Sequence, residues 1–210
     1  GRGRRGVSAL AVLGLLAGIA SVADTVPYVR DVLRGATRPH RGTWLIWSVL
    51  AAVACISQRA DGASWSLVLS ASQALVTGVV FLLAIRRGVG GVSVAELGLM
   101  AIAGAGVVGW LVADEPAVAT VCVVLADLVG VGLMVPKTWR NPCSETLATY
   151  VIASVSGALA TGAVGKVDAA LLLYPLYFLV VNAAIALLIH ARRRTAGHRA
   201  ARHPAVDAAA

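Results

Sequence analysis

The sequence predicts an all-α integral membrane protein with seven transmembrane helices, arranged as two parallel three-helix repeats around a single linking helix (3+1+3). Three observations support this prediction: the composition, the number of long apolar runs, and an internal repeat. Of the 210 residues, 59% are hydrophobic and only 13% are charged, whereas about a quarter of a soluble domain is charged. The chain therefore contains enough apolar sequence for several spans of about 20 residues each.

Seven apolar runs give the expected spans in order. The first run is longer than a signal peptide core, and it leads into a polar, proline-containing end rather than a small-residue cleavage site, so we expect it to be retained. The fourth run, "VAELGLMAIAGAGVVGWLV", is rich in small residues and lacks the repeated polar motif described below, which is typical of a connector. The runs are Val7–Val29, Thr43–Gln58, Ser64–Ile85, Val94–Val112, Ala117–Val135, Thr146–Val164 and Ala169–Ile189.

The basic residues are unevenly divided between the two ends of these spans. With seven spans, the N-terminal side holds five of the 18 Lys and Arg residues and the other side holds thirteen. The positive-inside rule then predicts an outside N-terminus and a cytoplasmic C-terminus. We expect a bacterial inner membrane, with anionic lipid headgroups near clusters such as "ARRR". Topology explains the net charge of +8, so we expect no nucleic-acid partner.

An internal repeat appears when the chain is shifted by 103 residues against itself. The segment that begins "VADTVPYVRDVL" then matches "LADLVGVGLMVP", with six identities in 23 positions, against roughly two expected by chance. The apolar identities carry little weight, but paired Asp, Pro and Thr residues are uncommon in this chain. These pairs are Asp24 with Asp127, Pro39 with Pro142, and Thr43 with Thr146; Trp47 also meets Tyr150.

The repeat divides the chain into four parts. Because three spans is an odd number, one further span lets the second triplet enter the membrane in the same direction as the first, which makes the repeats parallel. We expect a first repeat at 1–88, a linking helix at 89–114, a second repeat at 115–194 and a basic disordered tail at 195–210. This arrangement predicts a cavity between the triplets near the middle of the membrane, which is typical of transporters.

The chain resembles the PQ-loop family, which includes the SWEET sugar transporters. The residues that carry the resemblance are Pro27 in "DTVPYVRDVL", the basic loop that follows, and "GTWLIW" at the start of the next span. The pattern covers nearly the whole chain, but the Pro-Gln pair is replaced by Pro27-Tyr28, and the second half has Gly130 at the aligned position with its proline at Pro136. The resemblance implies the 3+1+3 fold and alternating access; it does not supply the substrate.

Two prolines are candidates for hinges. Pro27 and Pro136 each remove one backbone hydrogen bond and crowd the preceding turn, so either can bend its helix near the cytoplasmic end. In PQ-loop relatives such prolines are regarded as hinges for alternating access. The alternative is a fixed kink that improves helix packing, and both interpretations remain open.

Asp24 and Asp127 are the sharpest polar signals. A charged residue inside a span costs at least about 2.5–3.5 kcal/mol on insertion scales, so it normally has a partner or a task. We consider three interpretations: the aspartates couple transport to protons, they bind a cationic substrate, or they hold each triplet together through hydrogen bonds.

The remaining polar and aromatic side chains of the spans are candidates for lining a cavity. SWEET-like transporters use an asparagine in the last span of a triplet to bind substrate, so the resemblance implies such a role for Asn182. Flat aromatic surfaces would suit a sugar or a ring. The predicted substrate-binding residues are Asn182, Trp47, Tyr150, Gln73, Thr77 and Tyr177.

The sequence thus predicts a transporter for a small polar solute such as a sugar, amino acid, nucleoside or vitamin. The alternative is a membrane receptor of SWEET fold, or a subunit of a membrane complex, without transport. We find no pattern of residues that would place a nucleophile beside a base, and no Cys or His spacing typical of a metal site. We therefore expect that the protein is not an enzyme and that it binds neither a metal nor a cofactor. The three cysteines lack paired spacing and are expected to be free thiols.

Overall fold

The structure is a computed structural model that describes residues 2–60, 65–91, 93–113, 116–165, 167 and 169–202. The side chains of 2–8, 53–60, 65–73, 116–120, 169–171 and 196–202 lie outside the described set. Within these limits the regular structure is helical, which confirms the all-α part of the predicted class, while the seven-span 3+1+3 arrangement stays a prediction. The helices are α1 (Arg2–Ala23), α2 (Thr25–Leu33), α3 (Arg41–Ala60), α4 (Trp65–Arg87), α5 (Val94–Val112), α6 (Pro116–Arg140), the 3₁₀ turn η1 (Pro142–Ser144), α7 (Leu147–Ala163) and α8 (Ala169–Arg202).

Several of these helices have the length and apolar character of membrane spans. Four segments within the described residues meet both criteria: Ala9–Leu33, Val94–Val112, Val121–Arg140 and Leu172–Thr195. Helix α7 is apolar but has only 17 residues. Many large apolar side chains on these helices face outward, such as Leu15 at 66% and Leu111 at 57% exposure. An outward-facing apolar surface of this kind suits a lipid environment.

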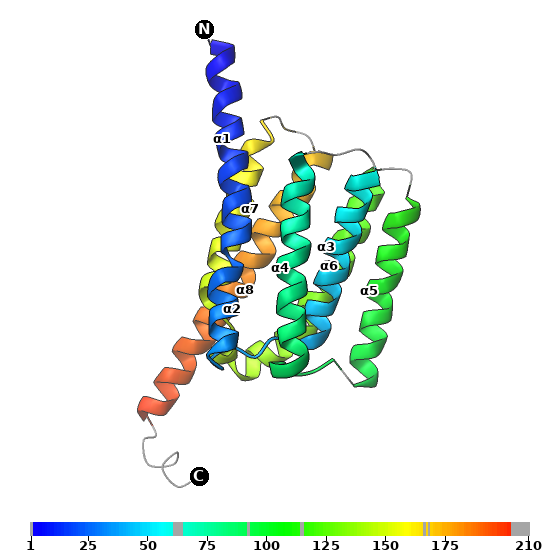
Figure 1. Ribbon diagram of the computed structural model, residues 1–210. Helices are drawn as coiled ribbons and strands as arrows, with labels where there is room; N and C mark the ends of the chain where they lie inside the picture. The colour runs from blue at the N-terminus through cyan, green and yellow to red at the C-terminus, as the bar shows by residue number, and fades with distance from the viewer. Residues whose placement is uncertain are drawn as a thin grey trace.

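The helices lie side by side in a bundle (Figure 1), and their contacts form a closed ring. Helix α1 packs on α7, α7 on α8, α8 on α6, α6 on α3, α3 on α4, and α4 on α1 and α2, while α5 lies outside the ring against α6 and α3. These contacts have a twofold pattern. If α1 and α2 are exchanged with α6, α3 with α7, and α4 with α8, every contact of the ring becomes another contact of the ring. This twofold pattern of contacts follows the same pairing of helices as the sequence offset of 103.

Asp24 separates α1 from α2 within what the sequence predicts as one span. The interruption falls three residues before Pro27, whose ring has no N–H to donate to the Ala23 carbonyl one turn earlier. The break is slight, because Asp24 keeps helical backbone angles (φ −60°, ψ −28°), and α2 continues the direction of α1 (Figure 1). Pro136 is different: it lies inside α6, which continues to Arg140.

The chain leaves the ring at both ends. Helix α1 extends beyond the bundle at one end and α8 extends beyond it at the other (Figure 1). Helix α8 continues to Arg202, so residues 195–202 are helical where the sequence predicted a disordered tail. Its polar, Ala-rich sequence favours helix even without an apolar stripe, because Ala and Arg have high helix propensity. The rest of that tail, 203–210, lies outside the described residues.

Glycines bring two pairs of helices close together. An added Cβ at Gly106 would lie 3.2 Å from the Ala126 Cβ, and one at Gly109 would lie 3.1 Å from the Cys122 Sγ, so α5 packs tightly on α6. At Gly157 in α7 an added Cβ would lie 2.7 Å from the backbone nitrogen of Leu179 in α8. Small residues at such crossings are a common means of packing helices in membranes.

We expect Gly157→Ala to destabilise the protein by about 1–3 kcal/mol, because the added methyl group would meet rigid backbone and force α7 and α8 apart. The matched control is Gly132→Ala in α6, where no atom lies within 4 Å of the added Cβ. This control should stabilise by roughly 0.5–1 kcal/mol, since alanine is the better helix former. Denaturant unfolding in detergent micelles measures both. Equal effects of the two substitutions would contradict the close contact at Gly157.

Trp47 lies at the meeting point of the apolar core. Three clusters of buried residues can be distinguished, one between α3, α5 and α6, one between α6, α7 and α8, and one between α2, α3 and α4. Trp47 packs against all three. Its ring also meets Trp44 edge-on, with the ring centroids 5.0 Å apart, a favoured aromatic geometry.

Candidate functional site

The first seam between the two halves runs along α3 and α6, from the Thr43 hydroxyl to the Asp127 carboxylate. The Thr43 hydroxyl donates to the Gly130 carbonyl at 2.6 Å. One turn earlier in α6, Asp127 accepts a hydrogen bond of 2.5 Å from the Tyr177 hydroxyl of α8. The Trp47 indole N–H lies beside the same carboxylate, in a geometry that falls short of a hydrogen bond. An aspartate, a tyrosine and a tryptophan from three helices therefore converge at this seam.

The second seam is the counterpart of the first and joins α7 to α1 and α2. The Thr146 hydroxyl donates to the Asp31 carboxylate at 3.0 Å and bonds the Thr37 hydroxyl at 2.7 Å. The Thr149 hydroxyl donates to the Asp24 carbonyl at 2.8 Å. The Asp24 carboxylate accepts from its neighbour Thr25 at 2.9 Å and lies near enough to Tyr150 to act on it electrostatically.

The uncommon identities of the repeat occupy matching places in these seams. Asp24 lies where α1 meets α2 and is close to α7, and Asp127 lies in α6 and is close to α3. Each repeated threonine, Thr43 or Thr146, starts the second helix of its half and bonds back across the seam. Trp47 and Tyr150, which pair at the same offset, each lie beside the aspartate of the opposite half. Residues that pair at the offset of 103 in the sequence therefore lie in similar surroundings.

The repeated prolines also make equivalent contacts. The Pro39 carbonyl accepts from the Val89 N–H at 2.9 Å, just beyond the end of α4. The Pro142 carbonyl accepts from the Arg193 guanidinium at 3.2 Å, nine residues before α8 ends at Arg202. The Pro39 loop is thus tied to the residues after α4, and the Pro142 loop is tied to α8.

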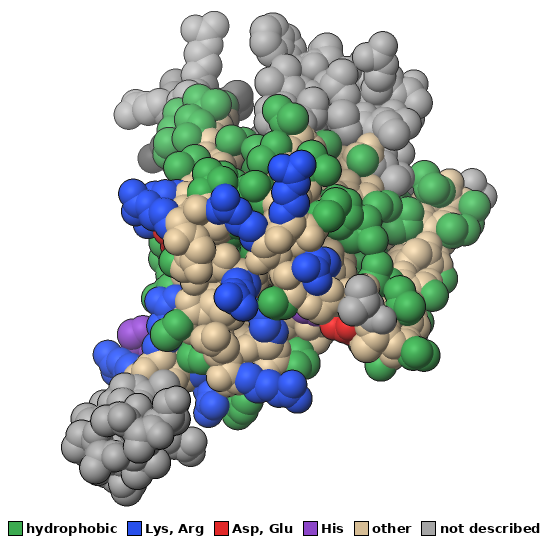
Figure 2. All heavy atoms as spheres, turned by 60° about the horizontal axis from the view of Figure 1, so that its bottom comes forward, with side chains coloured by type: hydrophobic (Ala, Val, Ile, Leu, Met, Phe, Trp, Pro, Cys, Tyr) green, Lys and Arg blue, Asp and Glu red, His purple; other side chains and the backbone are tan. Residues whose placement is uncertain are grey.

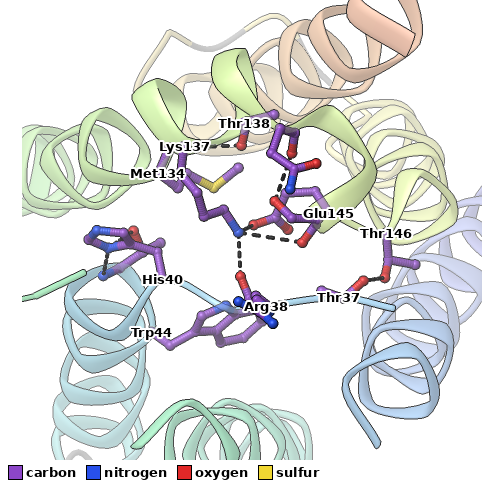
Figure 3. A network of polar contacts seen from close by, with 12 residues as sticks. Thr37, Arg38, His40, Trp44, Met134, Lys137, Thr138, Glu145 and Thr146 are labelled. Carbon is purple, nitrogen blue, oxygen red and sulfur yellow. Dashed lines mark hydrogen bonds and ion pairs between the residues drawn. The ribbon is translucent and has the colours of Figure 1, made fainter. Parts of the chain in front are cut away.

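A buried ionic network closes the end of the bundle where these loops lie (Figure 3). Glu145 is only 1% exposed, and its carboxylate pairs with Lys137 and accepts from the Tyr150 hydroxyl at 3.0 Å. The Lys137 ammonium also donates to the Arg38 carbonyl in the loop of the other half. The Tyr28 hydroxyl lies beside Glu145. The network links the loop after α2 to the loop after α6.

His40 joins the same region to α5. It is 3% exposed, and its Nδ1 accepts from the Thr43 N–H at 3.3 Å, which caps the start of α3. With Nδ1 as acceptor, Nε2 carries the proton and donates to the Glu96 carboxylate at 2.9 Å. Burial lowers the pKa of His40 below its ordinary 6.5, and the nearby Glu96 carboxylate opposes this effect. A neutral imidazole therefore suits both contacts at neutral pH.

This arrangement predicts a pH-dependent contribution to stability. Because the pKa of His40 is lower in the folded protein, the unfolded chain binds more protons just below pH 6.5, so stability falls as the pH falls through that window. In His40→Asn the cap is kept and this part of the slope should vanish. The measurement is the unfolding midpoint in detergent between about pH 5 and pH 8. The groups that face His40, namely Glu96, Lys137 and Glu145, are present in both proteins; identical slopes would contradict the prediction.

The predicted substrate-binding residues divide into two groups. Trp47 and Tyr177 meet at Asp127, and Tyr150 lies between Glu145 and Asp24. Two others turn to their own helices, since the Asn182 amide donates to the Phe178 carbonyl at 2.8 Å and the Thr77 hydroxyl to the Ala74 carbonyl at 3.3 Å. The side chain of Gln73 lies outside the described residues.

The sequence analysis did not identify the network of Lys137, Glu145 and Tyr28, or the capping role of His40. The available signal was the rarity of acidic residues: Glu145 is one of ten in the chain, and it sits between a proline loop and an apolar span. A glutamate held there without solvent needs a cation. Lys137, eight residues earlier, supplies it.

The end of the bundle that holds these loops is also strongly basic. We use "basic end" for the end where α2, α4, α6 and α8 approach their C-termini, with the loops at 34–40, 88–93 and 141–146. Figure 2 turns this end toward the viewer and shows Lys and Arg side chains spread over it. Some of them hold helix ends: Arg87 donates to the Val32 and Leu33 carbonyls, and Arg192 to the Trp139 carbonyl at 3.1 Å.

The fold and these contacts define an all-helical protein whose several apolar helices are compatible with a membrane protein, with two matched polar seams and a basic end. Comparison with protein-family models, curated proteins and solved structures finds no match to the chain.

Proposed function

We propose that the protein is a membrane transporter for a small polar solute, built from two parallel three-helix repeats around the linking helix α5. The observation that carries the proposal is the pair of matched seams, each with an aspartate, a threonine and an aromatic side chain. If the two repeats move relative to each other during alternating access, the contacts of the two seams are the ones that would break and re-form. In this arrangement α1 with α2, α3 and α4 form the first repeat, and α6, α7 and α8 form the second, as in PQ-loop and SWEET-like proteins.

Both aspartates are suited to reversible protonation. Each lies in an apolar helical segment, where an unpaired charge is costly, and each has neutral hydroxyl partners rather than a cation among the described residues. When the carboxylate of Asp24 or Asp127 is protonated, it becomes a weaker acceptor for the hydroxyl that donates to it. Protonation can therefore favour one arrangement of the seam over another. We assign proton coupling to Asp24 and Asp127, solute contact to Trp47 and Tyr177 beside Asp127, and bending to Pro27 and Pro136.

The basic end is then the cytoplasmic side, and its ionic network is the closed inner gate. Lys137 ties the loop of one half to Glu145 of the other, so opening this side requires that the network separate. The positive-inside rule supports the orientation. The outer side would hold the start of α1 and the α3–α4, α5–α6 and α7–α8 connections.

The orientation can be tested with the native cysteine at the basic end. Cys143 is exposed, whereas Cys122 is half-buried against α5. We expect a membrane-impermeant maleimide to label Cys143 in inside-out vesicles and not in intact cells, with Cys143→Ala as the control that removes the signal. Labelling of intact cells would place the basic end outside.

Flux in proteoliposomes tests the function itself. Radiolabelled glucose, lysine, uridine and thiamine represent the four solute classes, each assayed with and without an inward proton gradient. We expect gradient-driven uptake of one class, and loss of the gradient dependence in Asp24→Asn and Asp127→Asn. Unchanged flux and pH dependence in both variants would refute proton coupling. Absence of uptake of all four solutes would refute the transporter proposal for these classes and favour a receptor or a complex subunit.

A further inference from the structure

An open pocket of about 500 Å³ lies at the basic end, and Thr37 of the second seam is part of its wall. Its walls are the end of α2, the loop that follows, and the end of α4 with the residues after it. Four arginines line it and no acidic residue does: Arg34, Arg38, Arg86 and Arg87. A cavity with four guanidinium groups is a site for an anion, because arginine donates two hydrogen bonds to a phosphate in a fixed geometry.

Among the described residues, no acidic side chain neutralises the positive charge of Arg34, Arg38 and Arg86 in this pocket. The acid one turn before Arg34, Asp31, is engaged elsewhere, by Arg30 at 3.0 Å and by the Thr146 hydroxyl. Arg87 is fixed in place by the carbonyls at the end of α2. The pocket is therefore formed before any anion enters it.

An apolar stripe leads away from the pocket along α4. Leu75, Val79 and Leu82 are all exposed, and Arg86 continues the same helical face at the spacing of three and four residues. Leu33, which is 53% exposed, lies in the pocket wall itself. A charged recess that continues into an exposed apolar surface matches a molecule with an anionic head and an acyl chain.

We propose that this pocket binds the phosphate headgroup of an anionic phospholipid from the cytoplasmic leaflet, with an acyl chain along the exposed face of α4. Basic pockets at the cytoplasmic ends of membrane helices bind such headgroups. The proposal rests on the membrane orientation given above, but it does not depend on transport. The bound lipid would hold the end of α2 against the end of α4 on the first half of the molecule.

The test uses the full chain in detergent micelles, titrated with phosphatidylglycerol in a phosphatidylcholine background and followed by native mass spectrometry. We expect saturable binding of phosphatidylglycerol. In Arg34→Gln/Arg86→Gln the apparent affinity should fall roughly thirtyfold, the loss expected for two charges near the membrane surface. The control Arg140→Gln/Arg194→Gln removes the same charge from residues that do not line the pocket and should keep the affinity within about twofold.

Two results would overturn the proposal. If the control variant loses as much affinity as the pocket variant, the attraction is a diffuse effect of the basic end. If inorganic phosphate or glycerol 3-phosphate displaces phosphatidylglycerol at concentrations similar to its own, the pocket serves a free phosphate rather than a lipid. Flux is measured separately: specific lipid binding without flux would reject the transporter alone, and flux without specific lipid binding would reject the lipid site alone.

Discussion

Replacing Glu145 with glutamine is expected to lower the free energy of unfolding by about 3–5 kcal/mol, because it leaves a nearly buried lysine without its counter-charge. The Lys137 side chain is 14% exposed and that of Glu145 is 1% exposed, so water can do little to screen the remaining charge. In Glu145→Gln the Tyr150 hydroxyl can still donate to the amide oxygen, so the substitution removes the negative charge but keeps this hydrogen bond. Unfolding in detergent micelles, followed by circular dichroism, measures the loss.

The double variant Lys137→Met/Glu145→Gln distinguishes a lost ion pair from a damaged loop. Removing both charges should recover most of the stability, since no buried charge remains. The surface pair of Arg30 and Asp31, in which Arg30 is 57% exposed, provides the comparison, and Arg30→Gln should cost less than about 1 kcal/mol. The single variant Lys137→Met completes the comparison. If the losses in Lys137→Met and Glu145→Gln simply add in the double variant, Lys137 and Glu145 are not coupled and the gate assignment fails.

Trp47→Ala should have a similarly large effect, about 3–5 kcal/mol, because it removes a side chain that packs against all three clusters of the core. Trp47→Phe keeps most of the packing and should cost less than about 1.5 kcal/mol. The control is Trp139→Ala at the basic end. Trp139 is 53% exposed and lies 4.4 Å from the Arg192 guanidinium, a contact worth about 0.5–1 kcal/mol.

The phenylalanine variant also tests the assigned role of Trp47 at the first seam. Phenylalanine lacks the indole N–H that lies beside Asp127, so it separates packing from polar contact. We expect solute flux to fall in Trp47→Phe while the unfolding curve changes little. A loss of flux only in proportion to stability would make Trp47 a packing residue.

The class of fold was predictable because it depends on composition and periodicity. Long apolar runs separated by short polar loops specify helices whatever their neighbours are, and the offset between Asp24 and Asp127 already pairs the first helices of the two halves. Pro27 likewise marked the interruption at Asp24. The apolar runs and Pro27 are local features, and the offset is a repeat within the chain, so a single sequence is enough to find them.

The polar contacts of the site were not predictable in the same way. Glu145, Lys137 and Tyr28 come from three separate places in the chain, and nothing in their spacing says that they meet. Asn182 and Thr77 show the converse. A polar residue in an apolar helix suggests a pocket lining, but its side chain can also donate a hydrogen bond to a backbone carbonyl of the preceding turn. Which choice it makes depends on the neighbouring helix, not on the local sequence. The extension of α8 through 195–202 was missed because its helix propensity is not accompanied by an apolar face.

The exchange of partners across the seams has a consequence for the order of events during synthesis. Thr43 bonds a carbonyl 87 residues later in the chain, and the Asp24 carbonyl is bonded by a threonine 125 residues later. At a ribosomal rate of about 5–20 residues per second, these partners appear roughly 4–25 s after the groups that wait for them. During that interval the Thr43 hydroxyl and the Asp24 carbonyl lack these two partners. In the membrane topology proposed above, an insertase or a membrane chaperone would hold the helices α1 to α4 until α6 and α7 have emerged.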